Sequence, residues 1–227
     1  MAMKTAGGTF VDEIFKEVIY PARDQLMESR YFTDLRNGKL TKRRLQGFSL
    51  EHTWFNWSLL RGSSIRLIRA EGMDALKSVL GGIESEVTHP DLCMKFGLSL
   101  GLSEDDFKNH IPTIQTLAHT GVVVSSPLTI GNAAAGRASG MSNETIVQRY
   151  ATEFSEYLPK APYDLSEDAI EFFTIHGVVD VDHSRQAAEA VAKLATTDRD
   201  KELVWYTART QVTLKLAKFE GIYDAYA

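Results

Sequence analysis

Cysteine is almost absent from this sequence, since Cys93 is the one cysteine in 227 residues. A lone cysteine excludes an internal disulfide framework and fits a reducing cytoplasm. No apolar run approaches the ~20 residues that a membrane-spanning helix needs. The N-terminus also lacks the charged-then-apolar pattern of a signal peptide. We therefore expect a cytoplasmic protein that does not associate with a membrane.

Runs of basic residues are missing too, and the formal net charge is −5. Nucleic acids and anionic membrane surfaces attract clustered lysine and arginine, so neither is an expected partner. The apolar share of 44% and the charged share of 24% are ordinary for a globular chain. A length of 227 residues suits one domain, 1–227, acting on a small molecule.

Strand signals are also lacking, and the six prolines leave room for long helices. Apolar residues recur at three- and four-residue spacing, which is typical of helices packed on one face. The pattern predicts helices over 10–29, after Thr41, over 73–87, over 92–100 and from Pro112, with a break or kink at Pro127. Further helices are predicted over 144–157 with Asn143 as cap, over 169–193 and from Asp198 or Asp200 to 226. The fold class is all-α, a helical bundle of about seven or more helices.

Two short segments carry metal-binding residue types at helical spacing. Glu86 and His89 form a Glu-x-x-His pattern, and His176, Asp180 and His183 form His-x-x-x-Asp-x-x-His. Residues three and four apart lie on one face of an α-helix. If the two helices face each other, these side chains converge, and carboxylate with imidazole suits Fe(II), Mn or Zn. Glu-x-x-His on bundle helices is one way in which proteins build di-iron carboxylate sites.

Both segments can also be explained without a metal. A glutamate and a histidine three apart on a helix most often belong to a solvated face. The second segment resists that explanation, because Ile175, Val178, Val179 and Val181 make it apolar all round and so indicate burial. Ionisable groups are costly to bury without partners, which favours a metal or a buried polar network there. Asp182 lies off the stripe and is expected to be exposed or to cap.

At this point the chain resembles the heme-oxygenase-like helical family over nearly its whole length. That family includes the TenA-type thiaminases, the quinone synthase PqqC, the chlamydial CADD protein and the di-iron decarboxylase UndA. The matching stretches are 89–92 with 98–103, then Phe172-Phe173-Thr174 leading into His176, and finally the terminal 219–226. The resemblance implies an all-α fold, whereas the fold alone does not imply one chemistry.

The metal motif separates the branches of this family. Heme oxygenases place an axial histidine near the N-terminus, and because no histidine here precedes His52, no haem is expected. The thiaminases use a mid-chain cysteine nucleophile, whose position Cys93 does not match. The di-iron branch supplies Glu-x-x-His, a middle glutamate and His-x-x-x-Asp-x-x-His. The resemblance is therefore closest to the di-iron oxidase and oxygenase branch.

The middle glutamate of that pattern has two candidates. Counting back from His176 by the family's spacing places the middle glutamate near Glu144. Matching the helix pattern instead places it near Ser139 or Gly140, and neither of these residues can replace a carboxylate. Glu51 is the other candidate, because the related decarboxylase has an acid at a similar distance before its Glu-x-x-His. A solvated or capping role explains either glutamate equally, so the second metal position stays open.

The di-iron branch implies two irons, as Fe(II)/Fe(III), with O2 as co-substrate. The expected reaction is desaturation, C–C cleavage, decarboxylation or N-oxygenation of a small amino acid or fatty-acid-like carboxylate. Phe48, His52, Phe55 and the small residues of 133–140 are expected as pocket walls. Arg137 is a candidate for the substrate carboxylate, although an exposed or internally paired arginine explains it as well. His110 and His119 are expected to be surface or satisfied histidines.

Two other functions stay open beside the O2-activating metalloenzyme. One is a metal-independent oxidase of the PqqC type, in which pocket histidines and arginines activate a substrate that itself reduces O2. The other is a non-catalytic interaction protein of the CADD type. The spacing of the metal-binding residues favours the metalloenzyme. The resemblance also implies a homodimer.

Overall fold

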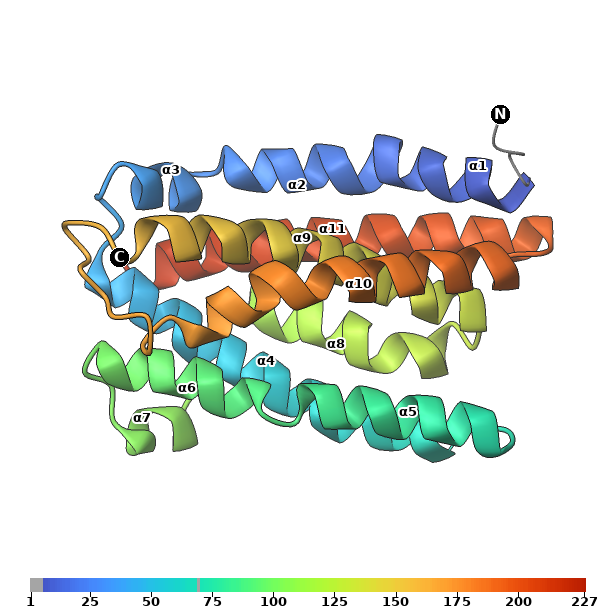
Figure 1. Ribbon diagram of the computed structural model, residues 1–227, viewed down its shortest axis with the longest axis horizontal. Helices are drawn as coiled ribbons and strands as arrows, with labels where there is room; N and C mark the ends of the chain where they lie inside the picture. Colours follow the sequence, from blue (N-terminus) through green and yellow to red (C-terminus); the bar gives the residue numbers. More distant parts are fainter. Residues whose placement is uncertain (1–5, 69) are drawn as a thin grey trace.

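The computed structural model describes the backbone of residues 6–68 and 70–227, and their side chains except those of 6–9, 78, 127–128 and 178–183. Throughout these described ranges the regular elements are helices, which confirms the predicted all-α class. Figure 1 shows α9, α10 and α11 in the middle of the molecule, with α1–α3 on one side and α4–α7 on the other. None of the described helices combines the length and apolar character that crossing a membrane demands.

The first helix predicted, over 10–29, is a continuous helical stretch with a wider turn inside it. It consists of α1 (Ala6–Ile14), a π-helical segment (Phe15–Ile19) and α2 (Tyr20–Met27). The remaining helices are α3 (Arg30–Arg36), α4 (Lys42–Ile68), α5 (Met73–Glu86), α6 (His89–Ser99), α7 (Glu104–Lys108), α8 (Ile114–Thr129), α9 (Ala133–Tyr157), α10 (Glu171–Leu194) and α11 (Asp198–Ala225).

Cap residues mark several helix starts as the sequence predicts. Thr41 Oγ1 accepts a hydrogen bond from the Arg44 amide at 3.2 Å, ahead of α4. Thr197 and Asp200 form a reciprocal capping box at the start of α11. Because these side chains satisfy amides that have no partner within the helix, they fix where each helix begins.

Two boundary predictions are wrong. The predicted cap at Asn143 lies inside α9, which is unbroken from Ala133 to Tyr157 and is capped instead by Asn132, whose Oδ1 accepts from the Ala135 amide at 2.9 Å. The backbone of α8 also stays helical past position 127 and ends at Thr129. Asparagine followed by glutamate reads locally as a helix start, yet packing on both sides of α9 overrides that signal.

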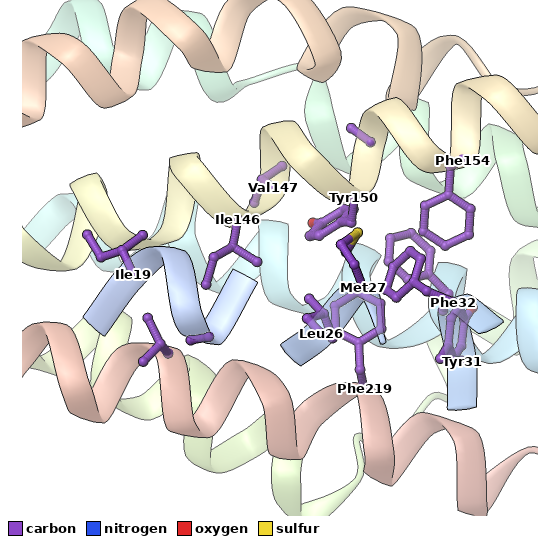
Figure 2. Close-up of a cluster of buried hydrophobic side chains, with 14 of the residues drawn as sticks. Ile19, Leu26, Met27, Tyr31, Phe32, Ile146, Val147, Tyr150, Phe154 and Phe219 are labelled. Carbon is purple, nitrogen blue, oxygen red and sulfur yellow. The ribbon is translucent and has the colours of Figure 1, made fainter. Parts of the chain in front are cut away.

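Aromatic rings from α3, α4, α9, α10 and α11 fill the middle of the core. Figure 2 shows part of it, with Phe32, Phe154 and Phe219 converging from three helices. Phe154 stacks on Phe173 with ring centroids 4.3 Å apart. Phe48 lies among six other rings at centroid distances of 4.9 to 6.4 Å. Each such side chain contributes about 1.5–3 kcal/mol through burial, so this cluster anchors the long helices against one another.

Two lysines of α11, Lys215 and Lys218, are buried in this core at 1% exposure each. Lys218 Nζ donates to His52 Nδ1 at 3.1 Å and lies 4.5 Å from the centroid of the Phe55 ring. His52 Nε2 lies 3.3 Å from the Tyr150 hydroxyl. Loss of hydration lowers the pKa of Lys218 to about 8, while the carboxylate of Glu51 opposes the shift. An ammonium in this position costs stability.

Replacing Lys218 with methionine should therefore stabilise the protein at neutral pH. The pKa of about 8, against 10.5 for the ordinary side chain, corresponds to a cost of about 3 kcal/mol. Below pH 8 both states are protonated and the cost is full, whereas between pH 8 and 10.5 only the unfolded state holds the proton. Urea unfolding of Lys218→Met should show a free-energy gain of about 1–3 kcal/mol at pH 7, after loss of the His52 bond. That gain should shrink as the pH rises.

Lys39→Met is the matched control, because Lys39 is exposed. It should change the free energy of unfolding little at any pH between 7 and 10. A Lys218→Met protein that loses stability at pH 7 and shows no pH trend would contradict the prediction.

Candidate metal centre

Glu86 and His89 meet at the junction between two helices, rather than on one helix as the sequence predicts. α5 ends at Glu86 and α6 begins at His89. Pro90 has no amide hydrogen to donate to the carbonyl of residue 86, so the helix is interrupted there. Val87 and Thr88 nevertheless keep right-handed helical dihedrals, so the two side chains still face each other, with Glu86 Oε2 2.6 Å from His89 Nδ1.

The helix α10 brings His176 against His89. Their ring centroids lie 4.2 Å apart, and each residue is 6% exposed. His176 Nδ1 donates to the Phe172 carbonyl oxygen at 2.6 Å, since a carbonyl can only accept. That bond places the ring proton of His176 on Nδ1, so Nε2 carries the lone pair with which the ring can bind a metal or accept a hydrogen bond. The contact between Glu86 and His89 Nδ1 has the same effect on the second ring.

Asp180 and His183 lie outside the described side chains. α10 is unbroken from Glu171 to Leu194, so positions 176, 180 and 183 follow one helical face by register. Among the side chains that are described, no three His, Cys, Asp or Glu residues form a cluster able to hold an ion. Of the predicted ligands, the described side chains bring three into successive contact: Glu86 contacts His89, and His89 contacts His176.

A cavity of about 600 Å³ opens beside these residues between α4, α5 and α9. Glu86 and Glu144 both line it, so the structure brings one of the two candidates for the middle glutamate to the same cavity as the Glu-x-x-His pair. Glu144 is half-buried and lies in the middle of α9, which makes it neither a cap nor a surface residue. Ser139 and Gly140 line the same cavity without supplying a carboxylate.

Glu51 occupies a different, closed environment. Its carboxylate accepts from the Thr113 amide at 3.0 Å, from the Thr113 hydroxyl at 3.2 Å and from the Tyr226 hydroxyl at 3.0 Å. Burial alone would raise the pKa of Glu51, but the nearby His110 ring, whose Nε2 lies 3.4 Å from Glu51 Oε1, and the hydrogen bonds from Thr113 outweigh it and lower the pKa. The ring of Tyr226 packs so closely on Gly47 that a Cβ there would lie 2.4 Å from it. This carboxylate joins the end of α11 to α4.

Two arginines also line the cavity. Arg137, the candidate for a substrate carboxylate, is joined there by Arg66 from the end of α4. Loss of hydration lowers the pKa of Arg66 first, and the like charge of Arg137 lowers it further, while Glu86 and Glu144 oppose the shift. The cavity therefore places two cations and two carboxylates within electrostatic reach of one another. Arg66 continues the helical stripe of Leu59 and Ser63, a spacing that would have pointed to it from the sequence.

The aromatic walls expected from α4 do not line this cavity. Phe48, His52 and Phe55 are 0%, 3% and 2% exposed and belong to the core described above. The wall is instead made of small residues, with Ala133, Gly136 and Gly140 on α9 and Gly82 on α5. A Cβ built on Gly82, Gly136 or Gly140 would meet open space. Residues of the 133–140 stretch, which the sequence suggested as a pocket wall, line this cavity.

The donor set fits a divalent iron, manganese or zinc ion. Imidazole nitrogens and carboxylate oxygens, two side chains of each kind here, are ligands for these metals. Thiolate ligation is excluded for the one cysteine, because burial raises the pKa of Cys93 to about 12 and its Sγ donates to the Ser49 carbonyl. The same protonated state removes Cys93 as a nucleophile.

Comparison with known proteins points to an iron enzyme. A family model described as iron-containing redox enzyme matches residues 48–216, a range that contains all the candidate ligands. The 4-aminobenzoate synthase of Chlamydia trachomatis is 25% identical over 198 residues, covering 86% of this chain and 84% of that protein. The 4-aminobenzoate synthase of Chlamydia muridarum is also 25% identical, covering 86% and 82%.

Solved structures confirm the heme-oxygenase-like fold expected from the sequence. A TenA homologue from Pseudomonas syringae superposes with a TM-score of 0.83 at 11% identity, covering 99% of this chain and 97% of that one. A domain of heme oxygenase-like fold from Shewanella denitrificans gives 0.81 at 15%, covering 95% and 93%. A CADD-like protein from Nostoc punctiforme gives 0.69 at 13%, covering 96% and 95%.

Two conservative substitutions separate the candidates for the middle glutamate. Glu144→Gln should lower the amount of iron bound per chain and leave the melting temperature of the metal-free protein nearly unchanged, because its side chain lines a cavity. Glu51→Gln should leave the iron content unchanged but cost about 1–3 kcal/mol of stability, because it weakens buried hydrogen bonds. Metal analysis after anaerobic reconstitution, with thermal unfolding of the same samples, measures both effects. The reverse result would assign Glu51 to the metal.

Proposed function

The chain belongs to the family of iron-containing redox enzymes, and within that family we propose that it is a non-haem di-iron oxidase or oxygenase. Its co-substrate is O2, and its substrate is a small carboxylate of the amino-acid or fatty-acid type. The observation that carries the proposal is the contact of His89 with His176, because His89 also contacts Glu86, which lines the same cavity as Glu144. Asp180 and His183 complete the proposed ligand set through the register of α10.

Iron held by Glu86, His89, Glu144 and the α10 ligands would supply the electrons for O2 activation. The protein's own groups hold and orient the ligands. The Phe172 carbonyl fixes the orientation of the His176 ring, and Glu86 fixes that of the His89 ring. The Phe172 ring lies 4.2 Å from the His176 ring and 6.4 Å from the His89 ring. Aromatic and buried surroundings exclude water from this side of the site, which limits loss of oxidising equivalents to solvent.

The cavity's charges support a carboxylate-bearing substrate. Arg66 and Arg137 provide planar guanidinium groups that can bind a carboxylate through paired hydrogen bonds. Gly136 and Gly140 leave room for the rest of the molecule along α9. The proposed reactions are desaturation, C–C cleavage, decarboxylation or N-oxygenation. The name of the chlamydial relatives, 4-aminobenzoate synthase, adds an aromatic carboxylate to the compounds worth testing.

Oxygen uptake tests the proposed function directly. The Fe(II)-loaded protein should consume O2 when mixed with oxygenated buffer, faster with a suitable carboxylate than without one, as followed with an oxygen electrode and stopped-flow absorbance. The His176→Ala protein should bind less iron and lose this uptake. A protein that consumes no O2 with Fe(II), yet turns over a quinone precursor when free of metal, would belong with the metal-independent oxidases instead.

Filling the cavity should separate substrate binding from metal binding. Gly140→Leu places a side chain into space where a Cβ meets nothing within 4 Å, so the helix should tolerate it and gain up to about 1 kcal/mol in helix propensity. Iron content should stay at the level of the parent, whereas acceleration of O2 uptake by a carboxylate should be lost. Gly121→Leu on α8 is the control, because its Cβ also meets open space and Gly121 does not line this cavity. Equal acceleration in both variants would place the substrate elsewhere.

A further inference from the structure

Asn143 is a buried carboxamide that touches both the cavity and the polar interior of the bundle. It is 6% exposed, lines the cavity and directly precedes Glu144 on α9. Its Oδ1 accepts from Lys215 Nζ at 2.6 Å and from Gln211 Nε2 at 3.4 Å, both on α11. Its Nδ2 donates to Glu144 Oε1 at 3.4 Å. One side chain thus connects a buried ammonium with a cavity carboxylate.

The contacts fix which way this amide faces. An ammonium can only donate hydrogen bonds, so the atom of Asn143 beside Lys215 must be the oxygen. The nitrogen is then directed to Glu144. Gln211 is itself held by its contact with His119, where Nε2 lies 2.9 Å from the ring Nε2. Gln211 and Lys215 are 0% and 1% exposed, so neither can leave the amide by swinging into solvent.

Stability explains one end of this side chain. The Asn143 oxygen satisfies the buried ammonium of Lys215, and removing one partner of a buried charge is strongly destabilising. The amide nitrogen meets a different kind of group, the half-buried carboxylate of Glu144, which lines the cavity. The direction in which Lys215 holds the amide therefore also decides what faces Glu144.

We propose that Asn143 is a positioning residue of the metal centre. Lys215 and Gln211 lock its amide, and the locked amide holds the Glu144 carboxylate in the orientation that binds the metal. This inference rests on the proposed function, because it assigns Glu144 to the metal. Hydrogen bonds to a ligating carboxylate typically change metal affinity by about 10- to 100-fold when they are removed.

Asn143→Asp is the sharpest test. It keeps an oxygen for Lys215 and Gln211 and changes the donor that faces Glu144 into an acceptor. Anaerobic calorimetric titration with Mn(II) should show that the variant binds Mn(II) at least about 10-fold more weakly than the parent does. The thermal unfolding of the metal-free protein should be nearly unchanged. When Glu144→Gln is already present, adding Asn143→Asp should not lower the Mn(II) affinity further, because the effect of Asn143 passes through the Glu144 carboxylate.

Asn132→Asp controls for added negative charge. Asn132 lines the same cavity, and its capping oxygen is preserved by the substitution. Because its Nδ2 also donates to Asp200 Oδ1 at 2.8 Å, the thermal unfolding of this variant is measured beside its Mn(II) affinity. An extra carboxylate near a cation site favours cation binding in general, so this variant should bind Mn(II) as tightly as the parent or more tightly. The proposal would be overturned if Asn143→Asp bound Mn(II) as tightly as the parent or more tightly. It would also be overturned if Asn143→Asp lowered the Mn(II) affinity by the same factor in the Glu144→Gln protein as in the parent.

Crystal structures of the metal-free parent and Asn143→Asp proteins keep this test separate from the proposed function. The Glu144 carboxylate should lie beside the residue 143 side chain in the parent and turn away from it in the variant. If the parent binds no metal, the proposed function fails, and the position of Glu144 in the two structures still decides the orienting role of Asn143. An unmoved Glu144 would overturn that role.

Discussion

The cost of burying charged and polar side chains inside a helical bundle shapes this structure. Beside its aromatic core, the described interior contains Glu51, Glu153, Lys215, Lys218 and four histidines in contact with other helices. Each such group needs a partner across a helix–helix contact. The helices α4, α9 and α11 are therefore held in register by specific pairs as well as by apolar packing. A displacement of one helix would leave several buried groups without their bonds.

The carboxylates of the interior and of the cavity wall fall into two kinds, and the difference separates structure from function. Glu51 is surrounded by Thr113, Tyr226 and His110, and Glu153 is held by Arg36 and Arg149. Both belong to the framework. Glu86 and Glu144 instead line an open cavity that two arginines also line. Only carboxylates of the second kind have room to receive an ion or a substrate, which is why the proposed chemistry is placed there.

Local patterns were enough to predict the helices and the pairing of Glu86 with His89, because caps and three-residue spacing act within one or two turns. They were insufficient for Glu144, since Asn143-Glu144 resembles a helix start and only the packing of α9 shows it to be mid-helix. The same limit explains Phe48, His52 and Phe55. An apolar stripe shows that a helix face is buried, but whether it faces the core or a cavity depends on the neighbouring helices.

The helix α9 joins these two environments, and its periodicity explains how. Ala138, Tyr150 and Phe154 face the aromatic core, whereas Gly136, Gly140 and Glu144, at four-residue intervals, line the cavity. Asn143 lies beside that second stripe and reaches α11 through Lys215. Glycine costs helix stability relative to alanine, and a buried ammonium costs more. The glycines fall on the cavity side of this helix, whereas buried ammonium groups occur both beside Asn143 and, as Lys218, in the aromatic core. The cost of the glycines therefore coincides with the candidate ligand Glu144, which supports a site kept for chemistry.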